Sequence, residues 1–103
     1  MTDKEMEEEL DALYNMEKPP ADAERFDEII LGAKRGDAKY QYLLGLFYFI
    51  GELVPESEEK AFYWYEKAAE QGHIEAQCQT ALMYEYGDGV AKNKEKAMQW
   101  QKD

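Results

Sequence analysis

The stretch Lys60–Gln77, KAFYWYEKAAEQGHIEAQ, decides the fold of this chain. It reads as the end of one helix, a glycine break at Gly72 and the start of the next helix. A shift of 36 residues superimposes matching residues on both sides of it. The pairs are Gly36 with Gly72, Gly51 with Gly87, Val54 with Val90, Glu59-Lys60-Ala61 with Glu95-Lys96-Ala97, and Trp64 with Trp100. The chain is therefore a repeat protein.

Helical spacing and end signals divide the sequence into six helices. They are expected over 3–14, 22–35, 38–50, from Ser57 to Gly72, over about 74–86, and after Asn93. Asp22, Asp37, Ser57 and Asn93 stand where N-cap residues are favoured. One helix pair cannot bury its apolar faces alone. The sequence therefore predicts an all-α superhelix, a solenoid of about three stacked antiparallel helix pairs.

At these positions the chain resembles the Sel1-like repeat family, relatives of the tetratricopeptide repeats. The first full copy carries Leu44, Gly45, Tyr48, Gly51, Val54, Lys60, Ala61, Trp64, Tyr65, Lys67, Ala68, Ala69 and Gly72. The second carries Ala76, Leu82, Tyr84, Gly87, Gly89, Val90, Lys96, Ala97 and Trp100. The departures are Tyr40 for an alanine, Leu53 for a glycine, Thr80-Ala81 for Leu-Gly, and Gln101 for a tyrosine. The resemblance implies a tetratricopeptide-like solenoid that binds other proteins.

The whole chain, 1–103, is interpreted as one repeat domain. Residues 1–32 are expected to be a degenerate first repeat, 33–68 a full repeat, and 69–103 a repeat whose last helix is truncated. A second interpretation lets the first helix leave the register and lie across the groove as a built-in ligand. Its apolar stripe, Met6, Leu10, Leu13 and Tyr14, suits either arrangement.

The net charge of −11 is concentrated at one end, because residues 1–30 hold eleven acids and three bases. Such a surface repels nucleic acid and anionic lipid, and it favours a basic protein as partner. No apolar run is long enough to span a membrane, and the acidic N-terminus is unlike a secretory signal. The single cysteine agrees with a reducing compartment, so a cytoplasmic location is expected. The oligomeric state stays open.

No residue pattern indicates catalysis, a cofactor or a metal site. His73 has no second histidine or metal-spaced acid beside it, so a capping or exposed role is expected. Cys78 has no resolving cysteine and is expected to be a small, semi-buried side chain. The many glutamates are interpreted as solvated faces, and the chain is expected not to be an enzyme.

A surface is therefore the candidate site. In tetratricopeptide-like stacks the first helix of each pair lines the concave side, and the resemblance implies the same here. If Leu44, Gly45 and Tyr48 face the partner helix, the other faces of helices three and five form an apolar band rimmed by acids. The predicted partner-binding residues are Lys39, Tyr42, Leu43, Leu46, Phe49, Ile50, Glu75, Gln79, Leu82, Glu85 and Tyr86.

The favoured function is a protein–protein interaction module that takes a basic partner in this groove. The resemblance adds a second hypothesis, because compact bacterial members often act as immunity proteins that neutralise a toxin. A third is that the chain is a structural fragment of a longer scaffold. Loss of the Tyr42 and Phe49 rings is expected to weaken partner binding with little loss of stability.

Overall fold

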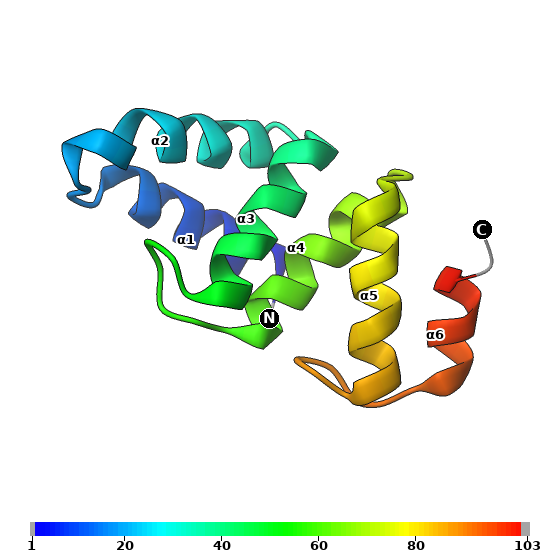
Figure 1. Cartoon of the computed structure of the whole chain (residues 1–103). Coiled ribbons are helices and arrows are strands. Elements are labelled where there is room, and N and C mark those ends of the chain that lie inside the picture. The colour runs from blue at the N-terminus through cyan, green and yellow to red at the C-terminus, as the bar shows by residue number, and fades with distance from the viewer. Residues whose placement is uncertain (1, 102–103) are drawn as a thin grey trace.

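The computed structural model describes residues 2–101, which form six α-helices and, within that range, no strand (Figure 1). The helices are α1 (Asp3–Asn15), α2 (Pro20–Lys34), α3 (Ala38–Ile50), α4 (Glu58–Glu70), α5 (Ile74–Tyr86) and α6 (Lys94–Gln101). The predicted all-α fold is confirmed, and the predicted bounds of α3 and α5 are those observed. None of the helices described here is long and apolar enough to cross a membrane.

Each helix from α3 onwards starts at a side-chain cap. Asp37, Ser57 and His73 accept hydrogen bonds from backbone N–H groups in the first turns of α3, α4 and α5. The amide oxygen of Asn93 accepts in the same way at the start of α6, at 3.0 Å. These bonds satisfy donors that a helix cannot satisfy itself, which explains why the chain begins a helix at each place.

The loops that join α3 to α4 and α5 to α6 have the same unusual backbone. Gly51 and Gly87 end α3 and α5 in the left-handed conformation, with φ of 75° and 72°. Two residues later Leu53 has φ 65° where Gly89 has φ 71°. The loop geometry is therefore kept although leucine replaces the glycine, at the steric cost of a left-handed non-glycine residue.

The core is built on the contact between α3 and α4. A side chain on Gly45 would lie 2.8 Å from the Tyr65 ring and 3.3 Å from the Ala61 carbonyl oxygen. The absence of that side chain lets the two helices approach closely, and Leu44, Ala61 and Tyr65 are fully buried between them. The α5–α6 pair stacks on this unit through the buried alanines Ala68, Ala69 and Ala76.

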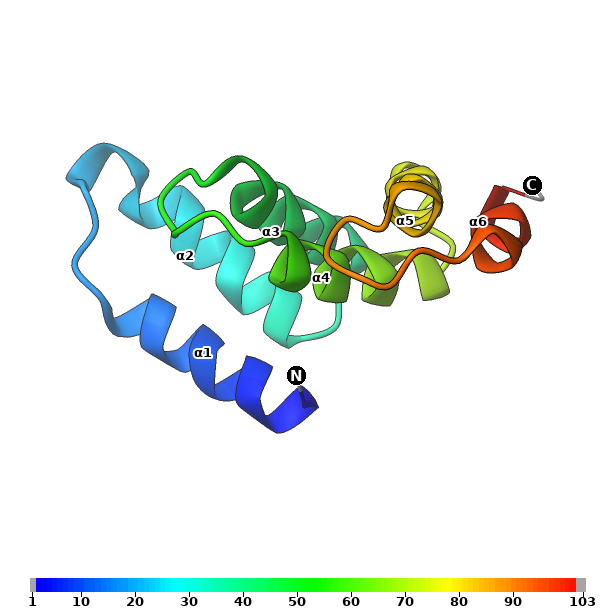
Figure 2. The same cartoon turned by 90° about the horizontal axis from the view of Figure 1, so that it is seen from below.

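Helix α1 lies on the opposite side of the stack from α3 and α5, as Figure 2 shows. Its apolar stripe Met6, Leu10 and Leu13 is buried in the main core. Its carboxylates bind the helix pair α3–α4: Glu9 accepts a hydrogen bond from the Tyr48 hydroxyl and lies 2.8 Å from the Lys60 ammonium. This placement differs from that of α3 and α5 in their own pairs, and the division into three repeats stays a prediction.

A buried lysine binds the carbonyl groups at the C-terminal end of α1. The ammonium of Lys18 donates to the carbonyl oxygens of Leu13, Tyr14 and Met16 at 2.9–3.0 Å, and it lies 2.9 Å from a carboxylate oxygen of Asp27 on α2. Only 3% of its side chain is exposed. A cation at the negative end of the helix dipole thus joins α1 to α2 across the Pro19–Pro20 segment.

Two predicted helix ends in this region are wrong. Asp22 does not cap α2, because α2 starts at Pro20 and Pro19 occupies the N-cap position without a side-chain bond. Proline is well suited to the first helical position, since its missing N–H would have no helical partner there. Helix α1 ends at Asn15, one residue beyond the predicted range 3–14, and Met16 follows it in an extended conformation.

The close approach at Gly45 predicts an inverted effect of alanine. Alanine in place of a helical glycine normally stabilises by up to about 1 kcal/mol, but Gly45→Ala is expected to destabilise by about 1–3 kcal/mol through overpacking against Tyr65. Urea unfolding monitored by circular dichroism measures the change. In the Tyr65→Gln background the same substitution should lose its penalty. A stabilising effect in the wild-type background would contradict the packing described here.

The contacts of α1 predict an acid-sensitive attachment. The Tyr63 hydroxyl and the Lys67 ammonium hold the pKa of Asp3 below its usual value of 3.8. This contribution to stability is therefore complete above pH about 4 and is lost as the pH falls through the lower folded value. Urea midpoints measured against pH should show a smaller acid dependence for Asp3→Asn than for wild type. Glu8→Gln, on the exposed side of α1, is the control and should keep the wild-type profile.

Candidate protein-binding face

All eleven predicted partner-binding residues lie at least partly exposed, on α3 and α5. We call them the α3–α5 face. Their helical neighbours Leu44, Gly45 and Tyr48 are buried against α4, as the sequence pattern predicted. The face comprises Lys39, Tyr42, Leu43, Leu46, Phe49, Ile50, Glu75, Gln79, Leu82, Glu85 and Tyr86. Whether they bind a partner stays a prediction.

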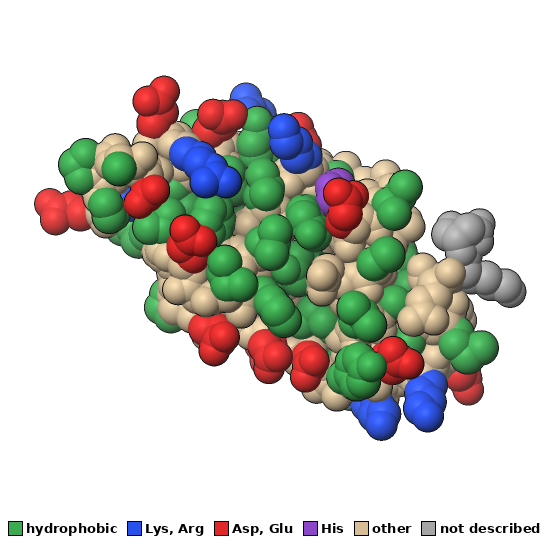
Figure 3. All heavy atoms as spheres, viewed as in Figure 1, with side chains coloured by type: hydrophobic (Ala, Val, Ile, Leu, Met, Phe, Trp, Pro, Cys, Tyr) green, Lys and Arg blue, Asp and Glu red, His purple; other side chains and the backbone are tan. Residues whose placement is uncertain are grey.

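The apolar part of the α3–α5 face is continuous across the two helices. Figure 3 shows hydrophobic side chains gathered over α3 and α5 in the centre of this side of the molecule. Ile50 is 56% exposed, Leu82 41% and Tyr86 68%. Large apolar side chains exposed together in this way are typical of an interaction surface.

The inner part of the face belongs partly to the framework. Tyr42 stacks on His73 with ring centroids 4.7 Å apart, and its ring lies 5.5 Å from that of the buried Tyr65. The Phe49 ring also lies beside Tyr65, with ring centroids 6.4 Å apart. Burial, with the nearby charge of Glu75, raises the pKa of Tyr42, so its hydroxyl keeps its proton at neutral pH. Tyr42 and Phe49 therefore support the fold as well as the surface, so the removal of their rings should also cost stability, contrary to the expectation from the sequence.

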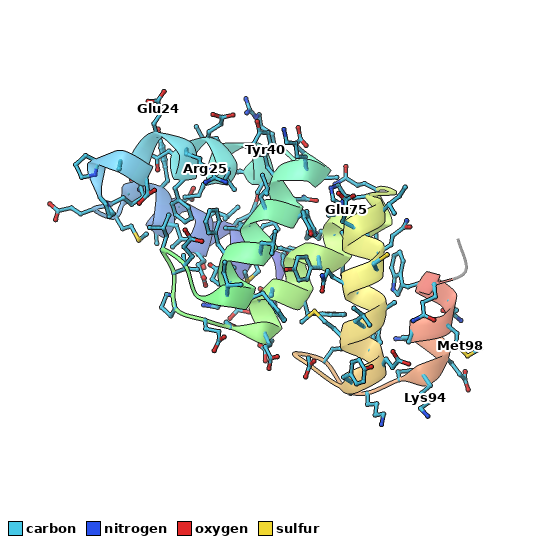
Figure 4. All side chains as sticks on the ribbon, viewed as in Figure 1. Glu24, Arg25, Tyr40, Glu75, Lys94 and Met98 are labelled. Atoms are coloured by element: carbon cyan, nitrogen blue, oxygen red, sulfur yellow. The ribbon has the colours of Figure 1, made fainter. Side chains whose placement is uncertain are left out.

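Tyr40 closes one end of the row of helices formed by α3 and α5. Its ring packs directly on Gly32 of α2, and its hydroxyl donates to Glu28 at 2.8 Å (Figure 4). Its counterpart one repeat later, Ala76, is fully buried in the alanine cluster between the helix pairs. The departure from alanine thus fits the position of α1: no helix precedes α3 in this row, and an aromatic ring covers the place.

Helix α1 does not cover the α3–α5 face. Its contacts are with Lys34 of α2, with Tyr48, whose ring points to the α4 side, and with Tyr63 and Lys67 of α4. Figure 2 shows α1 on the far side of α2 and α4 from this face. The interpretation in which the first helix occupies the groove is therefore wrong. Besides its buried apolar stripe, α1 makes polar contacts with α4, which the stripe alone could not reveal.

The sequence model of the Sel1 repeat matches residues 38–73 and again residues 74–100, which together exceed half of the chain. The chain belongs to the Sel1 repeat family. Sel1 repeats are typically protein–protein interaction modules, and their fold is generally a non-catalytic scaffold.

Solved structures of Sel1 repeat proteins have the same fold. A protective antigen of uropathogenic Escherichia coli with an SLR fold is 37% identical, with a TM-score of 0.71 over 74% of this chain. A Sel1 repeat protein from Oxalobacter formigenes is 31% identical, with a TM-score of 0.72 over 75%. This chain covers only 16% and 59% of those two proteins. No curated protein matches it.

The two polar residues singled out in the sequence have different outcomes. His73 is the N-cap of α5, since its Nδ1 accepts a hydrogen bond from the Ala76 N–H at 3.2 Å. This is one of the two roles expected for it, capping or exposure. Cys78 is exposed, so the expected semi-buried position is wrong. Its counterpart Tyr42 is covered by the next helix pair, whereas no described helix follows α6.

Sequence reasoning missed two exposed apolar residues, Ile74 and Met98, which lie outside the α3–α5 face. The 36-residue shift held the signal that could have found them. It relates Ile74 to Ala38 and Met98 to Phe62, and both counterparts pack toward the next helix pair. In the last described pair, α5–α6, no described helix follows to cover Ile74 and Met98.

The aromatic contacts predict that two residues of the face differ in their effect on stability. Tyr42→Ala should reduce the free energy of unfolding by about 1–3 kcal/mol, because it removes the contacts with Tyr65 and His73. Ile50→Ala, at a largely exposed position, should change it by no more than about 0.5 kcal/mol. Urea unfolding measures both. Equal effects of the two substitutions would show that the division into framework and free surface is wrong.

Proposed function

We propose that the chain binds a partner protein through the α3–α5 face. The observation that carries the proposal is the continuous apolar surface that remains on α3 and α5 after the core is complete (Figure 3). Ile50, Leu82 and Tyr86 are its most exposed apolar side chains, and the residues that the structure describes leave them uncovered. An amphipathic helix or an apolar loop matches such a band, because its own anchors would fill the spaces between these side chains.

Charge favours a basic partner. The carboxylates of Glu75 and Glu85 lie on the face itself, and the exposed Glu52 and Glu56 follow α3 in the adjoining loop. The net charge of −11 adds a long-range field of the same sign. A partner with lysine or arginine around an apolar centre would be attracted at a distance and paired at the rim of the interface.

The acidic field also favours a second candidate, stoichiometric inhibition of a basic enzyme such as a toxin. The eleven acids among residues 1–30 form the most strongly charged part of the chain. An inhibitor of this kind would form a tight one-to-one complex and abolish the enzyme's activity. An adaptor would instead bind several proteins without inhibiting them, so activity measurements on the captured partner separate the two candidates.

Affinity capture from the native host tests the proposal. Wild-type chain, the double variant Leu82→Glu/Tyr86→Glu and the control Met98→Glu are immobilised, and the bound proteins are quantified by mass spectrometry. Proteins captured through the α3–α5 face should fall at least tenfold with the double variant, a loss of about 1.4 kcal/mol, and stay with the control. The captured proteins should be basic.

The control is matched in exposure, because Met98 is as exposed as Tyr86 but lies on α6, outside the face. Equal capture by wild type and double variant would disprove the role of the α3–α5 face. Specific capture of strongly acidic proteins would disprove the electrostatic part of the proposal. Circular dichroism of the three proteins establishes that all are folded.

A further inference from the structure

A cleft of about 300 Å³ lies between α1 and the three helices that follow it. It shares no residue with the α3–α5 face. Its volume is at the small end of the range for ligand-binding clefts, so it suits a small molecule rather than a protein segment. The polar and charged side chains on its two walls are Asp3 and Glu7 from α1, Lys34 from α2, Gln41 from α3, and Trp64 and Lys67 from α4.

Two hydrogen-bond donors in the wall formed by α3 and α4 belong to buried side chains. Trp64 is only 3% exposed, and its indole N–H has no acceptor among the described residues. Gln41 is 5% exposed, and its side-chain oxygen accepts from Gln71 at 2.8 Å, which leaves its amide N–H groups for another partner. A buried donor without an acceptor costs stability. An acceptor atom of a ligand on this wall would remove that cost.

Two lysines add positive charge to the same side of the cleft. The ammonium of Lys67 lies 3.4 Å from a carboxylate oxygen of Asp3, and that of Lys34 lies 2.5 Å from Asp11. Each ammonium has three N–H donors, so a single carboxylate partner leaves donors for a second one. The wall formed by α2, α3 and α4 therefore suits a negatively charged group with several acceptors, such as a carboxylate.

The α1 wall has the opposite charge. Glu7 forms no ion pair with a base in the part of the chain that the structure describes. Its charge nevertheless acts across the cleft. The hydrogen bond with Asp11 and the charge of Glu7 raise the pKa of Lys34. Burial, with the charges of Asp3 and Glu7, raises the pKa of Tyr63, another lining residue. A positively charged group of a ligand would find its partner at Glu7.

We propose that this cleft binds a free α-amino acid with an apolar side chain. Two acids and two lysines line the cleft, so it has no net charge but two walls of opposite sign. A simple anion would be repelled by one wall and a simple cation by the other, whereas a zwitterion satisfies both. Its carboxylate would accept from the buried donors, and its ammonium would bind Glu7. Leu10 and the Tyr63 ring supply apolar surface for the side chain.

Isothermal titration calorimetry of the 103-residue chain tests the proposal with L-leucine as the probe. Leucine should bind with one-to-one stoichiometry. Isoamylamine, which is leucine without the carboxylate, should bind at least about tenfold more weakly, because bonds from buried donors to a charged group are lost. Isocaproate, which is leucine without the ammonium, should bind only several-fold more weakly, since Glu7 is exposed to solvent.

Three variants assign the two ends of the ligand. Glu7→Gln should weaken leucine binding several-fold and leave isocaproate binding unchanged, because isocaproate has no ammonium for this carboxylate. Trp64→Phe should weaken the binding of leucine and isocaproate alike. Lys67→Gln tests the same carboxylate end at a partly exposed position, where the fold does not depend on the side chain. Glu8→Gln, on the exposed side of α1, and Tyr86→Glu, on the α3–α5 face, are controls that should bind leucine like wild type.

The indole of Trp64 provides a second measurement. The chain has two tryptophans, and Trp100 does not line this cleft. In Trp100→Phe, leucine should change the fluorescence of Trp64 in proportion to the occupancy measured by calorimetry. Absence of saturable leucine binding at millimolar concentrations would overturn the proposal, as would equal binding of leucine and isocaproate. Leucine binding that is unchanged in both Glu7→Gln and Lys67→Gln would show that the cleft is not the site.

Discussion

The structure depends on the contact of Gly45 with Tyr65. Because position 45 has no side chain, α3 lies directly on the Tyr65 ring and the Ala61 carbonyl, and the ring becomes fully buried. Tyr42 and Phe49 then pack against the outer side of the same ring. One close approach thus holds the helix pair together and positions the inner residues of the α3–α5 face. The core and the candidate site cannot be varied independently at these residues.

The next pair has changed both partners of this contact together. Ala81 stands at the position of Gly45, and Gln101 at that of Tyr65, so a methyl group is present where no aromatic ring needs the space. Thr80, in place of Leu44, is fully buried and donates to the Ala76 carbonyl oxygen at 2.7 Å, which satisfies its hydroxyl within the helix. The sequence departures near α5 therefore compensate one another, which explains why the fold followed from the repeat pattern despite them.

The 36-residue period predicted the structural features that recur with it. Caps, glycine turns and the buried faces of α3 and α5 recur every 36 residues, and their predicted positions agree with the structure. The place of α1 was not predictable in this way, because its stripe Met6, Leu10 and Leu13 fits any apolar surface. Its polar contacts join residues far apart in sequence, such as Glu9 with Tyr48 and Asp3 with Tyr63. Ionic and tyrosine contacts of this kind leave no periodic signal.

A repeat pattern also hides exposure, since the same position is core in one pair and surface in the last. Met98 and Ile74 look like scaffold residues by their register, and only the structure shows that they meet no described helix.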